Sequence, residues 1–130
     1  MMVKRFAQIL GVVLILIGVV GLVLGNRVWL GILNVDIVED TVHLGTGALL
    51  AYVGFGRTDL PAARSVVLAL GVIYLVVGIL GFVVPMMFGL IPHGYTIFDD
   101  LLHLALGGLS LAVALSAPRG SRQTGRSASA

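Results

Sequence analysis

Hydrophobic positions along the chain fall into four long runs that are separated by short polar segments. The runs cover about residues 6–24, 38–55, 63–84 and 97–117. Each is close to the ~20 residues with which an α-helix crosses a hydrocarbon layer of ~30 Å. The second and fourth runs reach that length only if their acidic first turns lie among the lipid headgroups. The pattern predicts an all-α fold, a four-helix transmembrane bundle in a lipid bilayer.

The four runs repeat at a spacing of 60 residues. When residues 6–58 are compared with residues 66–118 without a gap, 14 of the 53 pairs are identical. A fixed internal spacing of this kind indicates a tandem duplication of a two-helix unit. Each unit crosses the membrane twice, so we expect parallel repeats related by a pseudo-two-fold axis along the membrane normal. The aligned pairs include Gly11/Gly71, Gly18/Gly78, Gly21/Gly81, Asp40/Asp100, His43/His103 and Gly47/Gly107, and Glu39 is aligned with Asp99.

Composition supports a membrane protein and argues against most soluble classes. The chain of 130 residues is 58% hydrophobic and only 11% charged, whereas a soluble domain has about 25% charged residues. It has no cysteine, so disulfides and thiolate ligands are excluded. We find no phosphate-binding loop, dinucleotide-binding fingerprint, zinc-protease motif or nucleophile elbow, so no enzyme activity is predicted. Nucleic-acid binding has no support beyond a few arginines.

The first run begins like a signal peptide, with a basic segment at residues 1–5. It is longer than a signal sequence, and no small-residue cleavage site follows Gly25. The second repeat contains its counterpart, so we expect a retained membrane span.

The basic residues predict the orientation of the chain. Four spans place seven of the eight Lys and Arg residues on one side, which the positive-inside rule makes cytoplasmic. We therefore expect cytoplasmic N- and C-termini and acidic residues on the outer side. The tail, residues 119–130, is polar and basic and is expected to be disordered. The seven are Lys4, Arg5, Arg57, Arg64, Arg119, Arg122 and Arg126, and the eighth is Arg27.

Glycines lie along one side of the first and third runs. Gly11, Gly18 and Gly25 are seven residues apart. Small residues let helix backbones approach closely in lipid. The glycines are therefore predicted to pack inside the bundle, or to form the seam of a homo-oligomer or a larger membrane complex. Residues 25–36 and 86–96 are expected to be short loops, and Ser110 and Ser116 to donate to helix carbonyls.

Ionisable residues inside membrane segments are costly and are candidates for function. Two motifs of the form acid-acid-x-x-His begin the second and fourth runs. Residues three or four apart share a helix face, so each acidic pair can meet the histidine of its own motif. The candidate site residues are Glu39, Asp40, His43, Asp99, Asp100 and His103.

Four interpretations of these motifs stay open. In the first, the acids stabilise a helix start through the helix dipole, and the motifs only tie two helices together. In the second, they bind a divalent metal such as zinc, iron or manganese, since paired Glu-x-x-His motifs occur in di-metal helical bundles. In the third, His43 and His103 are axial ligands of haem b. In the fourth, the cluster passes protons or cations. His93 is expected to be an exposed loop residue.

The run GLIPHGYTIFDDLLHLALGGLSL resembles the signature of a family of small bacterial four-span membrane proteins, a domain of unknown function. That family often carries the pattern N…D-N-x-x-H-x-x-x-G. The resemblance implies four membrane helices in a bacterial inner membrane and no particular reaction. We therefore expect a structural or accessory membrane protein, with metal or ion handling as the alternative. Asp99, His103 and Gly107 match the pattern, Asp100 stands where Asn is common, and Asn34, Glu39, His43 and Gly47 are the looser counterparts in the first half.

Overall fold

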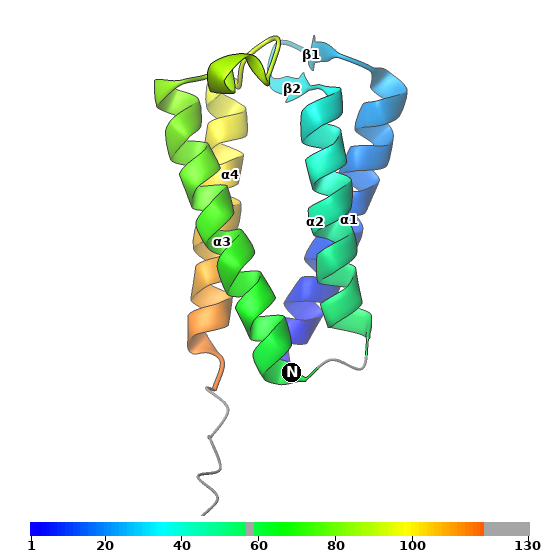
Figure 1. Cartoon of the computed structure of the whole chain (residues 1–130), viewed down its shortest axis with the longest axis vertical. Helices are drawn as coiled ribbons and strands as arrows, with labels where there is room; N and C mark the ends of the chain where they lie inside the picture. Colours follow the sequence, from blue (N-terminus) through cyan, green and yellow to red (C-terminus); the bar gives the residue numbers. More distant parts are fainter. Residues whose placement is uncertain (57–58, 119–130) are drawn as a thin grey trace, which may run out of the picture.

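Four α-helices run side by side along the long axis of the molecule (Figure 1). The computed structural model describes residues 1–56 and 59–118. The helices are α1 (Met2–Leu24), α2 (Ile37–Phe55), α3 (Leu60–Val83) and α4 (Ile97–Ser116). Their bounds lie within a few residues of the predicted runs, so the all-α prediction is confirmed. The prediction for the tail concerns residues 119–130, which lie outside the described residues.

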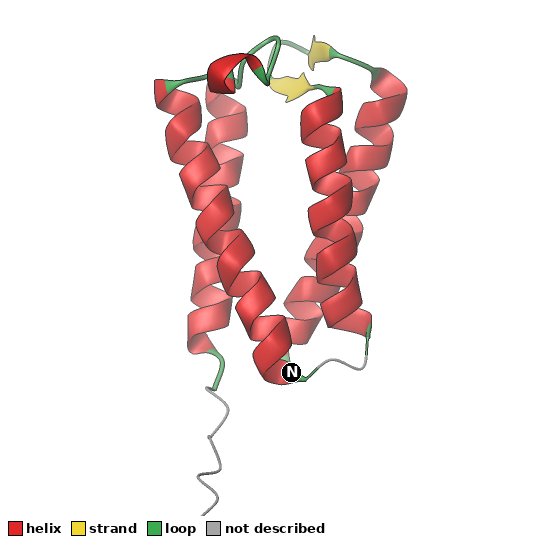
Figure 2. Ribbon diagram, in the orientation of Figure 1, coloured by secondary structure: helices red, strands yellow, loops and turns green. Residues whose placement is uncertain are grey.

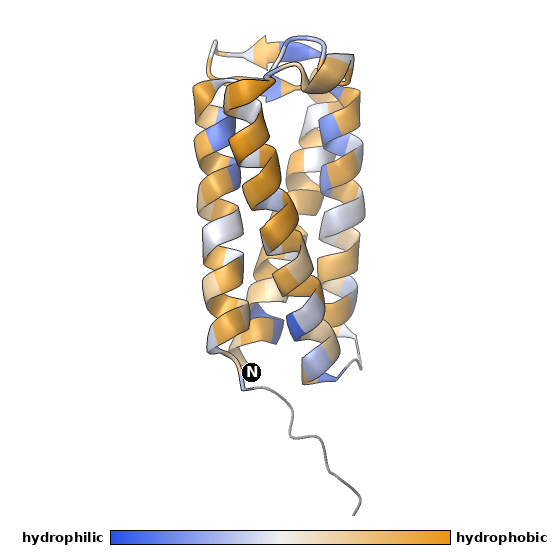
Figure 3. Cartoon of the chain, turned by 60° about the vertical axis from the view of Figure 1, so that its left-hand side comes forward, coloured by the Kyte–Doolittle hydropathy of each residue, from blue (hydrophilic) through white to orange (hydrophobic). Residues whose placement is uncertain are grey.

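Three of the helices, α1, α3 and α4, are long and apolar enough to cross a membrane. Within the described residues, α2 is not apolar enough to be counted with them. Glu39, Asp40 and His43 lower the mean hydropathy of its 19 residues. Large apolar side chains are exposed on all four helices, and most of the helix ribbon in Figure 3 has the colour of hydrophobic residues. An exposed apolar surface of this extent indicates a lipid environment.

The helices form two closely packed pairs, α1 with α2 and α3 with α4. Glycines make this packing possible. A Cβ atom added to Gly47 would lie 2.9 Å from the carbonyl oxygen of Gly11, and one added to Gly107 would lie 2.8 Å from that of Gly71. Both distances are too short for any side chain, so backbone meets backbone in each pair, as small residues allow in membrane helices.

Side chains near the start of α1 and α3 hydrogen-bond to the end of the partner helix. Lys4 Nζ donates to the Gly56 carbonyl at 2.9 Å, and Arg64 Nε donates to the Ala114 carbonyl at 2.7 Å. These carbonyls belong to the last turns, where intrahelical donors are lacking. Ser110 and Ser116 donate to the carbonyls of residues four positions earlier, as predicted.

The segment at residues 25–36, expected to be a loop, contains a small antiparallel sheet (Figure 2). Strand β1 (Arg27–Trp29) pairs with β2 (Leu33–Val35), with Trp29 opposite Leu33. At the turn, Leu30 and Gly31 both have positive φ, 52° and 71°. Such hairpin turns usually carry Asn or Asp before the glycine. The leucine explains why the sequence did not predict a hairpin.

The 3₁₀-helix η1 (Met87–Gly89) lies in the connection between α3 and α4, at the same end of the molecule as the sheet (Figure 1). We call this end, formed by residues 25–36 and 85–96 with the adjoining first turns of α2 and α4, the hairpin end. The N-terminus lies at the opposite end.

Adjacent glycines on α4 give a matched test of the helix pairing. Gly107→Ala is expected to destabilise the protein by about 1–3 kcal/mol, because the new methyl group would lie 2.7 Å from the Leu75 backbone nitrogen. Gly108→Ala meets nothing within 4 Å and should be neutral or stabilising by up to about 1 kcal/mol through helix propensity. Thermal unfolding in detergent measures both variants. Equal stability of the two would contradict the packing at Gly107.

Candidate functional site

Polar side chains at the hairpin end fix the first turns of α2 and α4. Asp36 caps α2, with its Oδ1 accepting from the backbone nitrogens of Val38 and Glu39 at 2.9 and 3.0 Å. Thr96 and Asp99 form a capping box on α4, in which Thr96 Oγ1 accepts from the Asp99 nitrogen and Asp99 Oδ2 accepts from the Thr96 nitrogen. Such caps satisfy backbone donors that the helix leaves free.

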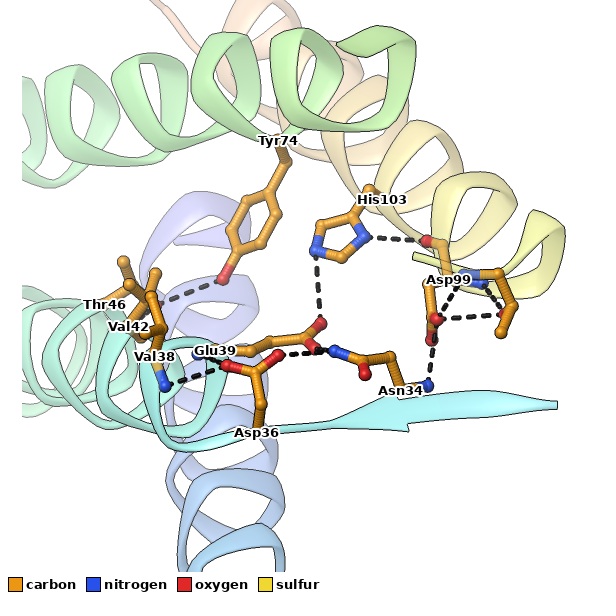
Figure 4. Close-up of polar contacts among 10 residues, drawn as sticks. Asn34, Asp36, Val38, Glu39, Val42, Thr46, Tyr74, Asp99 and His103 are labelled. Atoms are coloured by element: carbon orange, nitrogen blue, oxygen red, sulfur yellow. Dashed lines mark hydrogen bonds and ion pairs between the residues drawn. The ribbon is translucent and has the colours of Figure 1, made fainter. Parts of the chain in front are cut away.

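Strand β2 joins the two helix pairs at this end. The backbone nitrogen of Asn34 donates to Asp99 Oδ2 at 2.9 Å, and Thr96 Oγ1 donates to the Ile32 carbonyl. The Asn34 side-chain nitrogen donates to Asp36 Oδ2 and to Glu39 Oε2, at 2.5 and 3.1 Å. Asn34 therefore links the first turns of α2 and α4 (Figure 4).

Asp40 and Asp100 face away from this link and lie against glycines of the neighbouring helix. The Asp40 carboxylate is in the place that a Cβ atom of Gly21 would need, and the Asp100 carboxylate is in the corresponding place at Gly81. Neither pairs with the histidine of its own motif. The sequence left open which acid of each pair could meet its histidine, and Asp40 and Asp100 lie against glycines instead.

Glu39, His43 and His103 come together from α2 and α4. One possible metal-ligand atom from each residue lies within 4.8 Å of the others, and the two imidazole rings are 6.4 Å apart between centroids. His103 Nε2 is 3.9 Å from Glu39 Oε1 (Figure 4). We refer to these three residues as the acid–histidine cluster.

The hydrogen bonding of His103 sets its tautomer. Its Nδ1 lies 2.7 Å from the backbone carbonyl oxygen of Asp99. A carbonyl oxygen only accepts, so Nδ1 carries the proton and donates. In the neutral ring, Nε2 then presents a lone pair toward the Glu39 carboxylate. His43 Nδ1 is buried and has no partner within the described residues.

Two tyrosines that sequence reasoning missed enclose the cluster. The Tyr74 ring of α3 is 5.7 Å from the His103 ring, and its hydroxyl is 3.1 Å from Thr46 Oγ1. The Tyr95 ring packs edge-on against the His103 ring, with 5.2 Å between the ring centroids. Burial, followed by the charge of Glu39, raises the pKa of the Tyr95 phenol, which keeps it neutral. For Tyr74, the sequence did offer a signal, a tyrosine in the middle of an apolar run.

The hairpin end buries carboxyl groups without a basic partner. Five acidic residues there are less than 10% exposed, and none is ion-paired with Lys or Arg in the described parts, 1–56 and 59–118. A buried charge without compensation is costly, so this arrangement favours a bound cation or shared protons. The five are Asp36, Glu39, Asp40, Asp99 and Asp100.

A cavity of about 570 Å³ reaches the cluster. Helix α1 supplies more of its lining than any other element, nearly all of it apolar, and Leu102 and Leu106 of α4 contribute further apolar side chains. Glu39, His43 and His103 lie in its lining together with Asn34.

The six residues predicted from the sequence thus have different places. Glu39, His43 and His103 converge, Asp99 closes the α4 cap with its carboxylate, and Asp40 and Asp100 lie on glycines. His93 is exposed, as expected.

No protein-family model matches this chain, and no curated protein and no solved structure matches it either. The geometry of the hairpin end is therefore the basis on which a function is proposed.

The link between β2 and α4 can be tested at Asp99. Asp99→Ala removes the acceptor of the Asn34 backbone nitrogen, and we expect a loss of about 1–3 kcal/mol of stability together with faster hydrogen exchange at the Asn34 amide. Asp59→Ala is the control, because Asp59 caps α3 through the Ala62 nitrogen. It should cost about 0.5–2 kcal/mol and leave the Asn34 amide protected. Unchanged exchange at Asn34 in Asp99→Ala would argue against the link.

Proposed function

We propose that this protein is a four-span membrane protein that binds a divalent transition-metal ion at the acid–histidine cluster. The observation that carries the proposal is the approach of His103 Nε2 to Glu39 Oε1, 3.9 Å apart, beside His43. The Nδ1 proton of His103 is committed to the Asp99 carbonyl. Two lone pairs therefore face each other and repel unless a cation or a shared proton lies between them.

The dimensions suit a metal ion. Ligand atoms at the Zn–N and Zn–O lengths of ~2.0–2.2 Å are ~3.3–3.6 Å apart around a tetrahedral ion, so a small side-chain movement brings the two atoms, now 3.9 Å apart, to binding distance. A metal-binding histidine usually donates its other ring nitrogen to a carbonyl or carboxylate, and His103 does so. Two imidazoles and one carboxylate form a set typical of zinc, iron or manganese, with a further position for water or another ligand.

The other interpretations of the motifs have weaker support. Haem b requires the plane of a porphyrin between the two imidazoles. The Glu39 carboxylate lies 3.9 Å from His103 Nε2, the atom that would bind the haem iron, so it competes with the porphyrin for that space. A purely structural cluster leaves the His43 Nδ1 without a partner among described residues. Proton passage shares the same groups, but beyond Thr46, Tyr74 and Ser110 the described residues of the helix cores are mainly apolar. We propose no catalytic reaction.

Duplication of a two-helix unit is part of the proposal, and paired contacts support it. Positions 60 residues apart carry out the same task in each helix pair. Asp40 lies on Gly21 as Asp100 lies on Gly81, and Lys4 and Arg64 both donate to carbonyls at the end of the partner helix. The four helices would then form one bundle, with α2 spanning the bilayer because its acidic first turn lies at the headgroups. Membership of the family that the sequence resembles stays a prediction.

The metal site predicts a specific loss of binding. Wild-type protein purified and equilibrated with zinc, manganese or iron(II) should hold one ion per chain. His43→Ala, His103→Ala and Glu39→Gln should each weaken binding more than the ~10–100-fold that is typical of losing a second-shell group. Inductively coupled plasma mass spectrometry and titration calorimetry provide the measurements.

His93→Ala is the matched control, since His93 is exposed in the loop before α4, and it should bind like the wild type. Circular dichroism establishes that each variant keeps its helices. The proposal is overturned if folded His43→Ala and His103→Ala proteins carry as much metal as His93→Ala.

Orientation gives a second prediction. If the chain spans the membrane four times, seven of its eight basic residues fall on the side of the N-terminus, so we propose cytoplasmic termini and an outer hairpin end. The chain has no cysteine, which allows single-cysteine variants. In intact cells, a membrane-impermeant maleimide should label His93→Cys and leave Met2→Cys unlabelled until the membrane is opened. The reverse labelling would show the opposite orientation.

A further inference from the structure

The cavity beside the acid–histidine cluster has two chemically distinct parts. Its long part is lined by apolar side chains, and several of these are also exposed on the outside of the helices, including Leu16 (58%), Ile17 (46%) and Val20 (54%). The cavity is therefore open along α1. In the proposed membrane arrangement, this opening faces lipid.

The closed part of the cavity is rich in hydrogen-bond acceptors. Asn34 is 5% exposed and lines the cavity, and its Oδ1 has no partner within the described residues. The amide orientation is fixed, because Nδ2 donates to both Asp36 and Glu39. An unpartnered buried acceptor is costly and is normally satisfied by a donor. The Glu39 carboxylate next to it is a second acceptor.

We propose that this cavity binds a lipophilic molecule with a terminal hydroxyl group, which enters from the lipid between α1 and α4. The hydroxyl donates to Asn34 Oδ1, and the apolar chain lies along Val13, Ile17 and Val20 of α1. The volume of about 570 Å³ is within the ~300–1,000 Å³ of small-molecule pockets.

The chemistry of the cavity selects a neutral hydroxyl over charged head groups. The acidic residues around Asn34 repel an anion such as a carboxylate or phosphate. An ammonium group would have to lose its hydration to cross hydrocarbon, which is expensive, whereas an alcohol donor crosses at much lower cost. The inference goes beyond the metal site and does not need it, although the two share the lining residues Glu39, His43 and His103.

Photo-crosslinking can test the proposal with the full chain in lipid nanodiscs. The probe is octadecanol with a diazirine in its chain, and the matched probe is its methyl ether, which lacks the donor. The alcohol is expected to label α1 and α4 residues of the cavity, with the ether labelling at least about fivefold less, since the buried acceptor then stays unpaired.

Neighbouring valines on α1 give the control for position. Val20 lines the cavity, whereas Val19 does not, and both are about half exposed. Val20→Trp should lower labelling by the alcohol about tenfold by filling the cavity, and Val19→Trp should leave it unchanged. The proposal is overturned if alcohol and ether label equally, if both variants label equally, or if this face instead crosslinks to a second copy of the chain.

Labelling is measured on chelator-treated and on zinc-loaded protein, and metal content is measured on Val20→Trp. Specific labelling without metal binding would reject the metal site alone. Normal metal binding without specific labelling would reject the lipophile site alone.

Discussion

Close backbone contact at glycines sets the rotation of each helix about its own axis, and the hairpin end depends on that rotation. Gly47 on α2 lies against Gly11, and Asp40 lies against Gly21. Once these positions face α1, Glu39 and His43, which share another helix face, are directed toward α4. Gly107 and Asp100 orient α4 in the same way and direct His103 toward α2. The acid–histidine cluster is thus a consequence of how tightly each helix pair packs.

The sequence was sufficient to predict the extents of the helices. Apolar runs of about twenty residues and their polar ends determine the boundaries, and the cost of ionisable groups in such runs identified all three cluster residues. The sequence could not tell which of the four carboxylates would join the two histidines. Consecutive residues on a helix point about 100° apart, so the roles of Glu39 and Asp40 depend on a helix rotation that only tertiary contacts decide.

The hydrogen bonds that connect the two helix pairs also could not be predicted from the sequence. Asn34 and Asp99 are 65 positions apart, and no local pattern relates a single asparagine to a distant acid. The hairpin around Asn34 was missed because Leu30 occupies a backbone conformation that normally favours Gly, Asn or Asp. Tyr74 has Leu14 as its counterpart in the 60-residue alignment, so the repeat gave no indication that this position contributes to the site.

Glu39 and Asp99 occupy matching positions, yet one methylene group separates their behaviour. The longer Glu39 side chain extends to within 3.9 Å of His103 on the other helix pair, while the shorter Asp99 side chain turns back to the start of its own helix and to Asn34. The Glu39 carboxylate is thereby available as a ligand, whereas the Asp99 carboxylate fixes the start of α4 and its link to β2. A chain with two identical halves would have to use the same side chain for both purposes. Under the proposed duplication, the difference between Glu39 and Asp99 is one of those by which two similar helix pairs present a single asymmetric site.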